Sequence, residues 1–181
     1  ESINLFDLKG VGKSPSKLDM SRILSINEHY IKHVEEKKLF ELLEIYCEKF
    51  NKPLKSSKSS VILKSINFLK NKAKTLEDIY QNAQYILDDK IEIPAEDKSL
   101  INQSSKDILK DFLDAFKKIK KIDKSSLEKI INKLIQAHKT NFKGVGQPLR
   151  IVLTGSKFGP AVYDILLSLD KEEIIKRLKN I

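Results

Sequence analysis

The stretch QPLRIVLTGSKFGP, residues 147–160, decides how the chain is expected to fold, because it interrupts a sequence otherwise rich in lysine and isoleucine. Pro148 suits the first turn of a short helix, since its missing N–H would have no partner there anyway. Gly155 is a natural end for that helix, and Gly159 and Pro160 open a second one. The residues just before this stretch, TNFKGVG, are expected to form a loop.

Outside this stretch, apolar residues recur at helical spacing and predict a series of helices. The expected helices are residues 19–33 with Asp19 as N-cap, 36–50, about 59–72, 75–89 with a capping box in TLED, 95–119, 123–139 capped by Asp123 or Ser125, and a last helix that begins with a capping box of Asp170 and Glu173. No strand pattern appears after residue 10. The predicted fold class is therefore all-α, with two small helical bundles in series. Pro94, in DDKIEIPAED, marks the expected boundary between residues 34–92 and residues 93–181.

Composition favours an anionic partner without naming one. The 181 residues carry a net charge of +9 and a sequence pI near 9.4. An alternative is that a compositional bias toward lysine produces this charge and that many lysines only solvate helix faces. Cys47 is the single cysteine, so a reducing, cytoplasmic location and a core role for its thiol are expected. No apolar run is long enough to predict a membrane span.

Three catalytic or ligand-binding patterns fail on inspection. GVGKS, residues 10–14, mimics the end of a phosphate-binding loop, but the glycine required five positions before the Gly-Lys pair is Asp7. His29 and His33 share a helix surface, but no cysteine or carboxylate cluster completes a metal site nearby. No serine, histidine and aspartate occur in a catalytic order. The sequence therefore predicts no catalytic residue, no cofactor site and no metal site.

Two blocks of sequence resemble one family. PLRIVLTG followed by GP and the terminal LDKEEIIKRLKNI, together with KSPSKLDMSRILSINEHYI at residues 13–31, are similar to the C-terminal part of bacterial-type glutamyl-tRNA synthetases. The resemblance implies that residues 1–33 end a connector beside the tRNA stem and that two anticodon-binding bundles follow. The HIGH and KMSKS signatures of this class I family are absent. We therefore expect a fragment of a larger ligase that cannot aminoacylate alone, with ATP and magnesium bound on the missing catalytic domain.

The resemblance also assigns site residues. Those implied at the anticodon are Arg150, Lys72, Gly159, Pro160 and Val162, and those implied at the tRNA stem or connector are Lys13, Ser14, Lys17 and Asn27. Arg150 is notable because a guanidinium is a flat fork of five donors that can stack on a base or bind its edge. Many family members carry arginine where this chain has Lys72, which suggests weak discrimination at the third anticodon base. Without the resemblance, Arg150 would be read as an ion-pair partner on a helix surface.

The function implied is recognition of the tRNA(Glu) anticodon by a monomer, with tRNA(Gln) left open as a second substrate and no membrane involved. A helical protein-interaction module whose positive charge has no specific role is the alternative. Binding to an anticodon hairpin, compared with an unrelated hairpin of equal length, separates the two.

Overall fold

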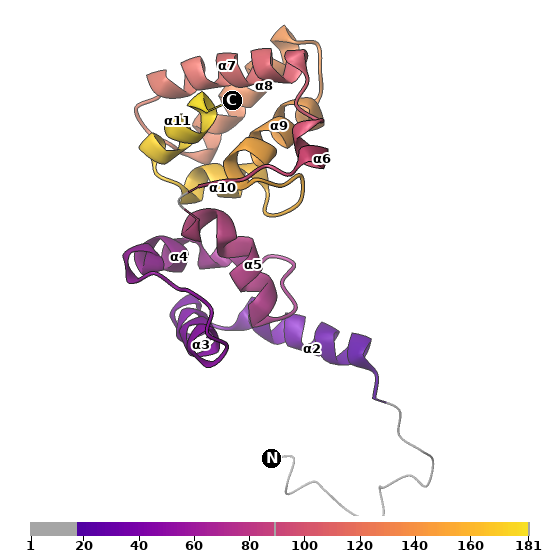
Figure 1. Cartoon of the computed structure of the whole chain (residues 1–181), viewed down its shortest axis with the longest axis vertical. Coiled ribbons are helices and arrows are strands. Elements are labelled where there is room, and N and C mark those ends of the chain that lie inside the picture. The colour runs from indigo at the N-terminus through magenta and orange to yellow at the C-terminus, as the bar shows by residue number, and fades with distance from the viewer. Residues whose placement is uncertain (1–17, 89, 181) are drawn as a thin grey trace, which may run out of the picture.

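The protein is all-α, as the sequence predicts, in the parts that the computed structural model describes, residues 18–88 and 90–180. The described helices are α2 (Met20–His33), α3 (Glu36–Lys49), α4 (Ser56–Leu69), α5 (Leu76–Leu87), α6 (Ala95–Lys98), α7 (Gln103–Lys118), α8 (Lys124–Ala137), α9 (Phe142–Thr154), α10 (Val162–Ser168) and α11 (Lys171–Lys179). Figure 1 shows them as two groups along the long axis, α2 to α5 and α6 to α11, with α10 facing the first group. The predicted boundary at residues 92 and 93 stays a prediction.

Local capping explains where several of these helices begin. The side chain of Asp19 accepts a hydrogen bond from the backbone N–H of Arg22 at 3.2 Å. Thr75 and Asp78 form a reciprocal capping box at the start of α5. Asp123 caps α8 by accepting from the N–H of Ser126 at 2.9 Å. The sequence predicts all three caps, because an N-cap needs only a short polar side chain and the next three residues.

Two helix boundaries differ from prediction in the middle of the chain. α4 begins at Ser56, before the start predicted at about residue 59, so Ser56, Ser57 and Lys58 form its first turn. The single helix expected over residues 95–119 is broken into α6 and α7. The break occurs because Asn102 caps α7, its side chain accepting from the N–H of Ser105 at 2.9 Å.

The helix through Pro148 is longer than predicted, and its start was predicted wrongly. α9 begins at Phe142 because the side chain of Asn141 accepts from the N–H of Gly144 at 3.0 Å. Pro148 therefore lies inside the helix, where it removes the N–H that would bond the carbonyl four residues earlier. The predicted end is correct, because Gly155 ends the helix in the left-handed conformation, with φ of 80°.

The capping box predicted for the last helix does not form. Asp170 stands at the N-cap of α11, but its side chain makes no capping hydrogen bond. Glu173 instead accepts a hydrogen bond from Nε of Arg177, one turn along the same helix, at 2.7 Å. The Glu173 carboxylate thus pairs with a fully charged, buried donor on its own helix and does not turn back to the N-cap.

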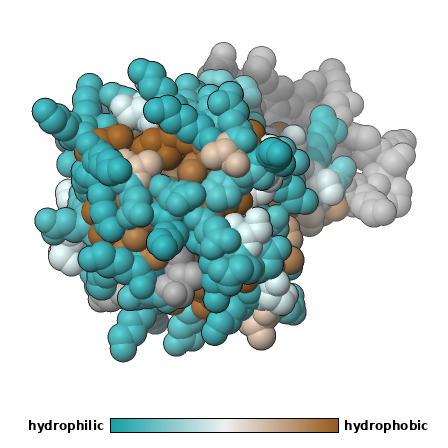
Figure 2. Space-filling view, turned by 90° about the horizontal axis from the view of Figure 1, so that it is seen from above, coloured by the Kyte–Doolittle hydropathy of each residue, from teal (hydrophilic) through white to brown (hydrophobic). Residues whose placement is uncertain are grey.

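A contiguous apolar core runs through both groups of helices. α10 packs on α4 of the first group and on α8 and α9 of its own, and α5 contacts α9. The hydroxyl of Tyr85 on α5 lies 2.6 Å from Oγ of Ser168 on α10, which adds a polar contact across the same junction. Cys47 is buried, as predicted, and burial raises the pKa of its thiol. Seen from the end of the molecule, hydrophilic side chains cover most of the surface, with apolar strips between them (Figure 2).

Candidate functional site

A pocket of about 430 Å³ lies where the two groups of helices meet. One side, the turn wall, consists of residues from the α4–α5 turn and the first half of α5: Asn71, Lys72, Asp78, Gln81 and Asn82. The other side, the loop wall, consists of a residue of α9 and the loop that follows it: Arg150, Gly159, Pro160 and Ala161. The pocket therefore brings together four of the five residues that the resemblance assigns to the anticodon, from both groups of helices.

Arg150 holds the loop wall in shape. Its Nε donates a hydrogen bond to the carbonyl of Pro160 at 3.1 Å, and its Nη1 donates to the carbonyl of Lys157 at 3.0 Å. Burial lowers the pKa of Arg150. Within the described residues it forms no ion pair, so interpreting it as a surface ion-pair partner is wrong. Nε and Nη1 of the guanidinium thus bond the loop, and Nη2 has no hydrogen-bond partner among the described residues.

A second anchor fixes the same loop from the side of α6. The backbone N–H of Lys157 donates to Oδ2 of Asp97 at 2.9 Å, and its ammonium lies 3.2 Å from Oδ1 of that carboxylate. Asp97 is only 6% exposed, so its carboxylate is shielded from water, whereas the side chain of Lys157 is 29% exposed. Gly155 packs directly on the neighbouring backbone, because a Cβ at this position would lie 2.6 Å from the carbonyl oxygen of Glu92.

The turn wall is held by short-range polar contacts and leaves Lys72 exposed. Oδ2 of Asp78 accepts from the N–H groups of Lys74 and Thr75, at 2.8 and 3.0 Å. The side chain of Asn82 donates to the carbonyl of Leu69 at 2.9 Å, which fixes the end of α4. Lys72 sits between these contacts with φ of 65°, a left-handed conformation that is costly for a residue with a Cβ. Its ammonium has no partner within the described residues.

The remaining predicted residues lie elsewhere. Val162 follows the loop, but its side chain is 1% exposed in the core and does not line the pocket. Asn27, assigned to the tRNA stem, donates its side-chain N–H to the carbonyl of Lys74 at 2.5 Å and so ties α2 to the turn wall. Lys13, Ser14 and Lys17 lie outside the described residues, as does GVGKS at residues 10–14.

Sequence inspection missed several members of this site. Asn71, Gln81 and Asn82 bring amide side chains, which carry both donors and acceptors, to the turn wall. Phe158 projects from the loop wall with 74% of its surface exposed. The signal available in the sequence was the order lysine, aromatic, glycine and proline in a turn, which has no apolar periodicity to bury the ring.

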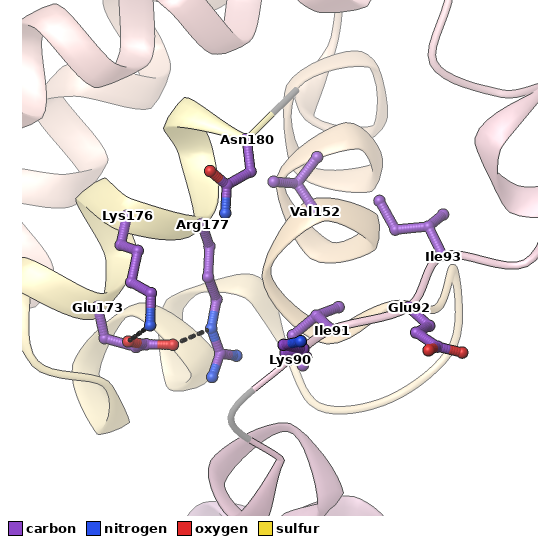
Figure 3. A pocket seen from close by; sticks show the side chains of 9 residues that line it. All are labelled: Lys90, Ile91, Glu92, Ile93, Val152, Glu173, Lys176, Arg177 and Asn180. Atoms are coloured by element: carbon purple, nitrogen blue, oxygen red, sulfur yellow. Dashed lines mark hydrogen bonds and ion pairs between the residues drawn. The ribbon is translucent and has the colours of Figure 1, made fainter.

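A larger hollow of about 580 Å³ lies between α9, α11 and residues 90–93 (Figure 3). Its one buried cation, Arg177, has all its nitrogens engaged. Nε donates to Glu173, Nη1 to the carbonyl of Leu153 at 2.6 Å, and Nη2 to the carbonyl of Asp88 at 3.4 Å. Burial opposes the ionisation of Glu173. The hydrogen bond and the charge of Arg177 outweigh it, so the pKa of Glu173 is lowered. Arg177 in this hollow therefore links the end of α9 to the end of α5, and we infer a structural role for it.

Residues 18–88 and 90–180 contain neither a metal site nor a membrane-spanning helix. No group of three or more histidine, cysteine, aspartate or glutamate side chains is placed to hold a metal ion. No helix in this part of the chain combines the length and apolar character needed to cross a membrane.

Known proteins resemble the chain over nearly its whole length. A family described as "Anticodon binding domain" matches residues 30–181. A glutamate–tRNA ligase of Pelagibacter ubique is 55% identical over 180 residues, which cover 99% of this chain and 39% of that protein. Glutamate–tRNA ligase 2 of Rickettsia akari is 31% identical, with 100% of this chain and 39% of that protein covered. A crystal structure of a glutamate tRNA ligase from Elizabethkingia meningosepticum, in complex with its amino acid, matches with a TM-score of 0.78 at 21% identity, over 97% of this chain and 34% of that one. The chain thus spans about two fifths of the length of these relatives.

Proposed function

The chain belongs to the anticodon-binding domain family, and from this premise we propose that it recognises the anticodon of tRNA(Glu) as the C-terminal part of a glutamate–tRNA ligase. In this proposal the anticodon loop binds at the pocket between the turn wall and the loop wall. The ligase joins glutamate to tRNA in a class I, ATP-dependent reaction, and ATP and magnesium bind on a catalytic part outside this chain. The protein acts in the cytoplasm as a monomer.

The pocket is the observation that supports this proposal most directly. Anticodon bases are splayed single-stranded bases, which proteins recognise by stacking and by hydrogen bonds to base edges. The turn wall offers the amide of Asn71 and, in Lys72, an ammonium without a partner among the described residues. Gln81 and Asn82 each already donate one hydrogen bond within the protein, which leaves their oxygens and second N–H for base edges. The loop wall offers a backbone held in one shape by Arg150 and Asp97, which limits the entropy lost on binding. Both kinds of group face one space of suitable size.

Hairpin binding tests the proposal. Affinity of the chain for a tRNA(Glu) anticodon hairpin is compared with affinity for an unrelated hairpin of equal length, over a range of salt concentrations. We expect preference for the cognate hairpin and a slope of about −0.7 to −0.9 in log affinity against log salt for each phosphate contacted. Equal affinity for both hairpins would support the protein-interaction alternative instead.

Lys72 tests the finer part of the proposal, which concerns tRNA(Gln). Glutamate and glutamine anticodons differ at the third base, C against G. A lysine on four rotatable bonds can direct its ammonium to acceptors on either base, whereas a guanidinium imposes one geometry. We expect a preference for C below about tenfold, or about 1.4 kcal/mol, and a larger preference after Lys72→Arg. A strong preference in the unmodified protein that the arginine leaves unchanged would contradict this.

A further inference from the structure

Phe158 stands at the tip of the loop wall, beside the pocket but not in its lining. We propose that the ring of Phe158 is a stacking platform for a base of the anticodon loop and so fixes how the next base enters the pocket. The inference rests on the proposed function, because it names a contact that the same tRNA would make. It adds a residue that the resemblance does not assign to the site.

The first support is the exposure of the ring, which packs against no other aromatic side chain among the described residues. Phe158 is 74% exposed, against 55% for Phe50 and 44% for Phe142. Those two rings pack against tyrosines, with ring centroids 4.8 Å apart for Phe50 and 5.7 Å apart for Phe142. In the described parts of the chain Phe158 has no such partner, and the ammonium of Lys157 lies 5.4 Å from its centroid. A phenyl ring left in water forgoes the free energy of burial, so this one is available to a partner.

The second support is the rigidity of the backbone that carries the ring. Arg150 donates to the carbonyls of Lys157 and Pro160, one on each side of Phe158. The N–H of Phe158 itself donates to Oγ of Ser156 at 3.1 Å. The backbone on both sides of the ring is therefore held in place, and only rotation about the side-chain torsions of Phe158 can redirect the ring. Presenting an aromatic on a fixed backbone reduces the entropy lost when a partner binds.

The surroundings favour a nucleic acid base over an apolar protein segment. Next to the ring, a Cβ on Gly159 would meet no atom within 4 Å, so the space there is open. The amides of the turn wall and Lys72, whose ammonium has no partner in the described parts of the chain, line the adjoining pocket and suit base edges and phosphates. Stacking of a base on an aromatic side chain tolerates any base, because every base has a π-face.

The test uses the absence of tryptophan from the chain. Phe158→Trp places the only indole at the tip of the loop wall, and Phe50→Trp places a control indole on the surface at the end of α3. Tryptophan fluorescence is followed while each variant is titrated with the tRNA(Glu) anticodon hairpin, and the anisotropy of a labelled hairpin gives the affinity independently. We expect saturable quenching of Phe158→Trp at the affinity that anisotropy reports, and no saturable change for Phe50→Trp.

Affinity variants separate stacking from general apolar contact. Phe158→Ala and Phe158→Leu should each weaken hairpin binding by about tenfold, while Phe158→Tyr should stay close to the unmodified protein. If Phe158→Leu binds as well as Phe158→Tyr, the contact is not a stack and the inference is wrong. If the hairpin binds but neither the fluorescence nor the affinity depends on this residue, the inference fails and the proposed function stands. If the unmodified chain shows no preference for the cognate hairpin, the proposed function itself fails.

Discussion

The two walls of the pocket face the same space but are built in opposite ways. The loop wall is fixed by two charged side chains, the buried Asp97 from 60 residues away in the sequence and the half-buried Arg150 of α9, acting on backbone N–H groups and carbonyls. The turn wall is fixed by the amide of Asn82 and a capping box, and its cation, Lys72, has no partner among the described residues. One wall presents a rigid shape, and the other presents a movable charge.

This difference separates two tasks of nucleic acid recognition. Shape and stacking require groups held in place, whereas attraction to phosphates needs only a charge in the right region. We expect substitutions in the loop wall to change stability and hairpin specificity together. Substitutions at Lys72 should change hairpin affinity with a separate, and even opposite, effect on stability.

The largest effect is expected at Arg177, because its buried guanidinium braces the end of α9 against the end of α5. Arg177→Met removes a buried guanidinium and leaves Glu173 buried in part without its partner. We expect the free energy of unfolding to fall by about 3 kcal/mol, the lower end of the range for breaking a buried ion pair, because Glu173 is 27% exposed and keeps Lys176 nearby. Denaturant unfolding of the chain measures it. The matched control is Lys176→Met, an exposed neighbour 3.7 Å from the same carboxylate, which should change stability little. Equal losses in both variants would contradict the brace.

Asp97→Ala should have the next largest effect, confined to the loop wall. It leaves the backbone N–H of Lys157 without an acceptor, at a cost of about 1–3 kcal/mol. Hairpin specificity should fall as well, because the loop loses one of its two anchors. Glu96→Ala serves as the control, since the Glu96 carboxylate is 87% exposed and lies 3.9 Å from the ammonium of Lys157, which also pairs with Asp97. Unfolding and hairpin binding measured on both variants would show whether burial of the pair matters.

Lys72→Gly should stabilise the chain while it weakens hairpin binding. Glycine tolerates the left-handed conformation that Lys72 adopts, so we expect a gain of about 1 kcal/mol in the free energy of unfolding. The loss of the ammonium should reduce affinity and make the salt dependence shallower. Lys72→Ala is the control, since it removes the same charge and keeps the strained conformation. A gain in stability for Lys72→Ala as large as that for Lys72→Gly would show that backbone strain is not the cause.

The smallest effect concerns pH and the base of the turn wall. Hydrogen bonds from Tyr46, Gln81 and Lys52 lower the pKa of Glu77 from 4.5 to about 2. Because the folded pKa is depressed, this carboxylate stabilises the fold above about pH 4.5, and that contribution is lost as the pH falls toward 2. Glu77 is partly exposed, so solvent screening keeps the effect small. Glu77→Gln should flatten the decline of melting temperature in this range, and Glu48→Gln, an exposed carboxylate on α3, should not.

How much the sequence predicts depends on the distance between interacting residues. The caps at Asp19, Thr75 and Asp123 were predictable because each acts within three residues. The start of α9 was predicted wrongly because Pro148 is a strong local signal for a first helical turn, whereas the Asn141 cap lies outside residues 147–160. The resemblance selected four residues of the pocket, but it gave no hint that Arg150 spends two donors on its own loop. Asp97 could not be assigned, since its partner lies 60 residues away in the sequence.

The anchoring of the loop wall also sets the order in which the pocket can form as the chain folds. The turn wall needs contacts only 3 and 13 residues apart, which close quickly. In the loop wall, the two contacts of Arg150 span only 7 and 10 residues, but the N–H of Lys157 waits for Asp97, 60 residues away. Contacts of long sequence separation form late in folding. A refolding chain should therefore protect its amide hydrogens at the start of α5 before those of residues 155–160, and its RNA-binding capacity should return only with the second set.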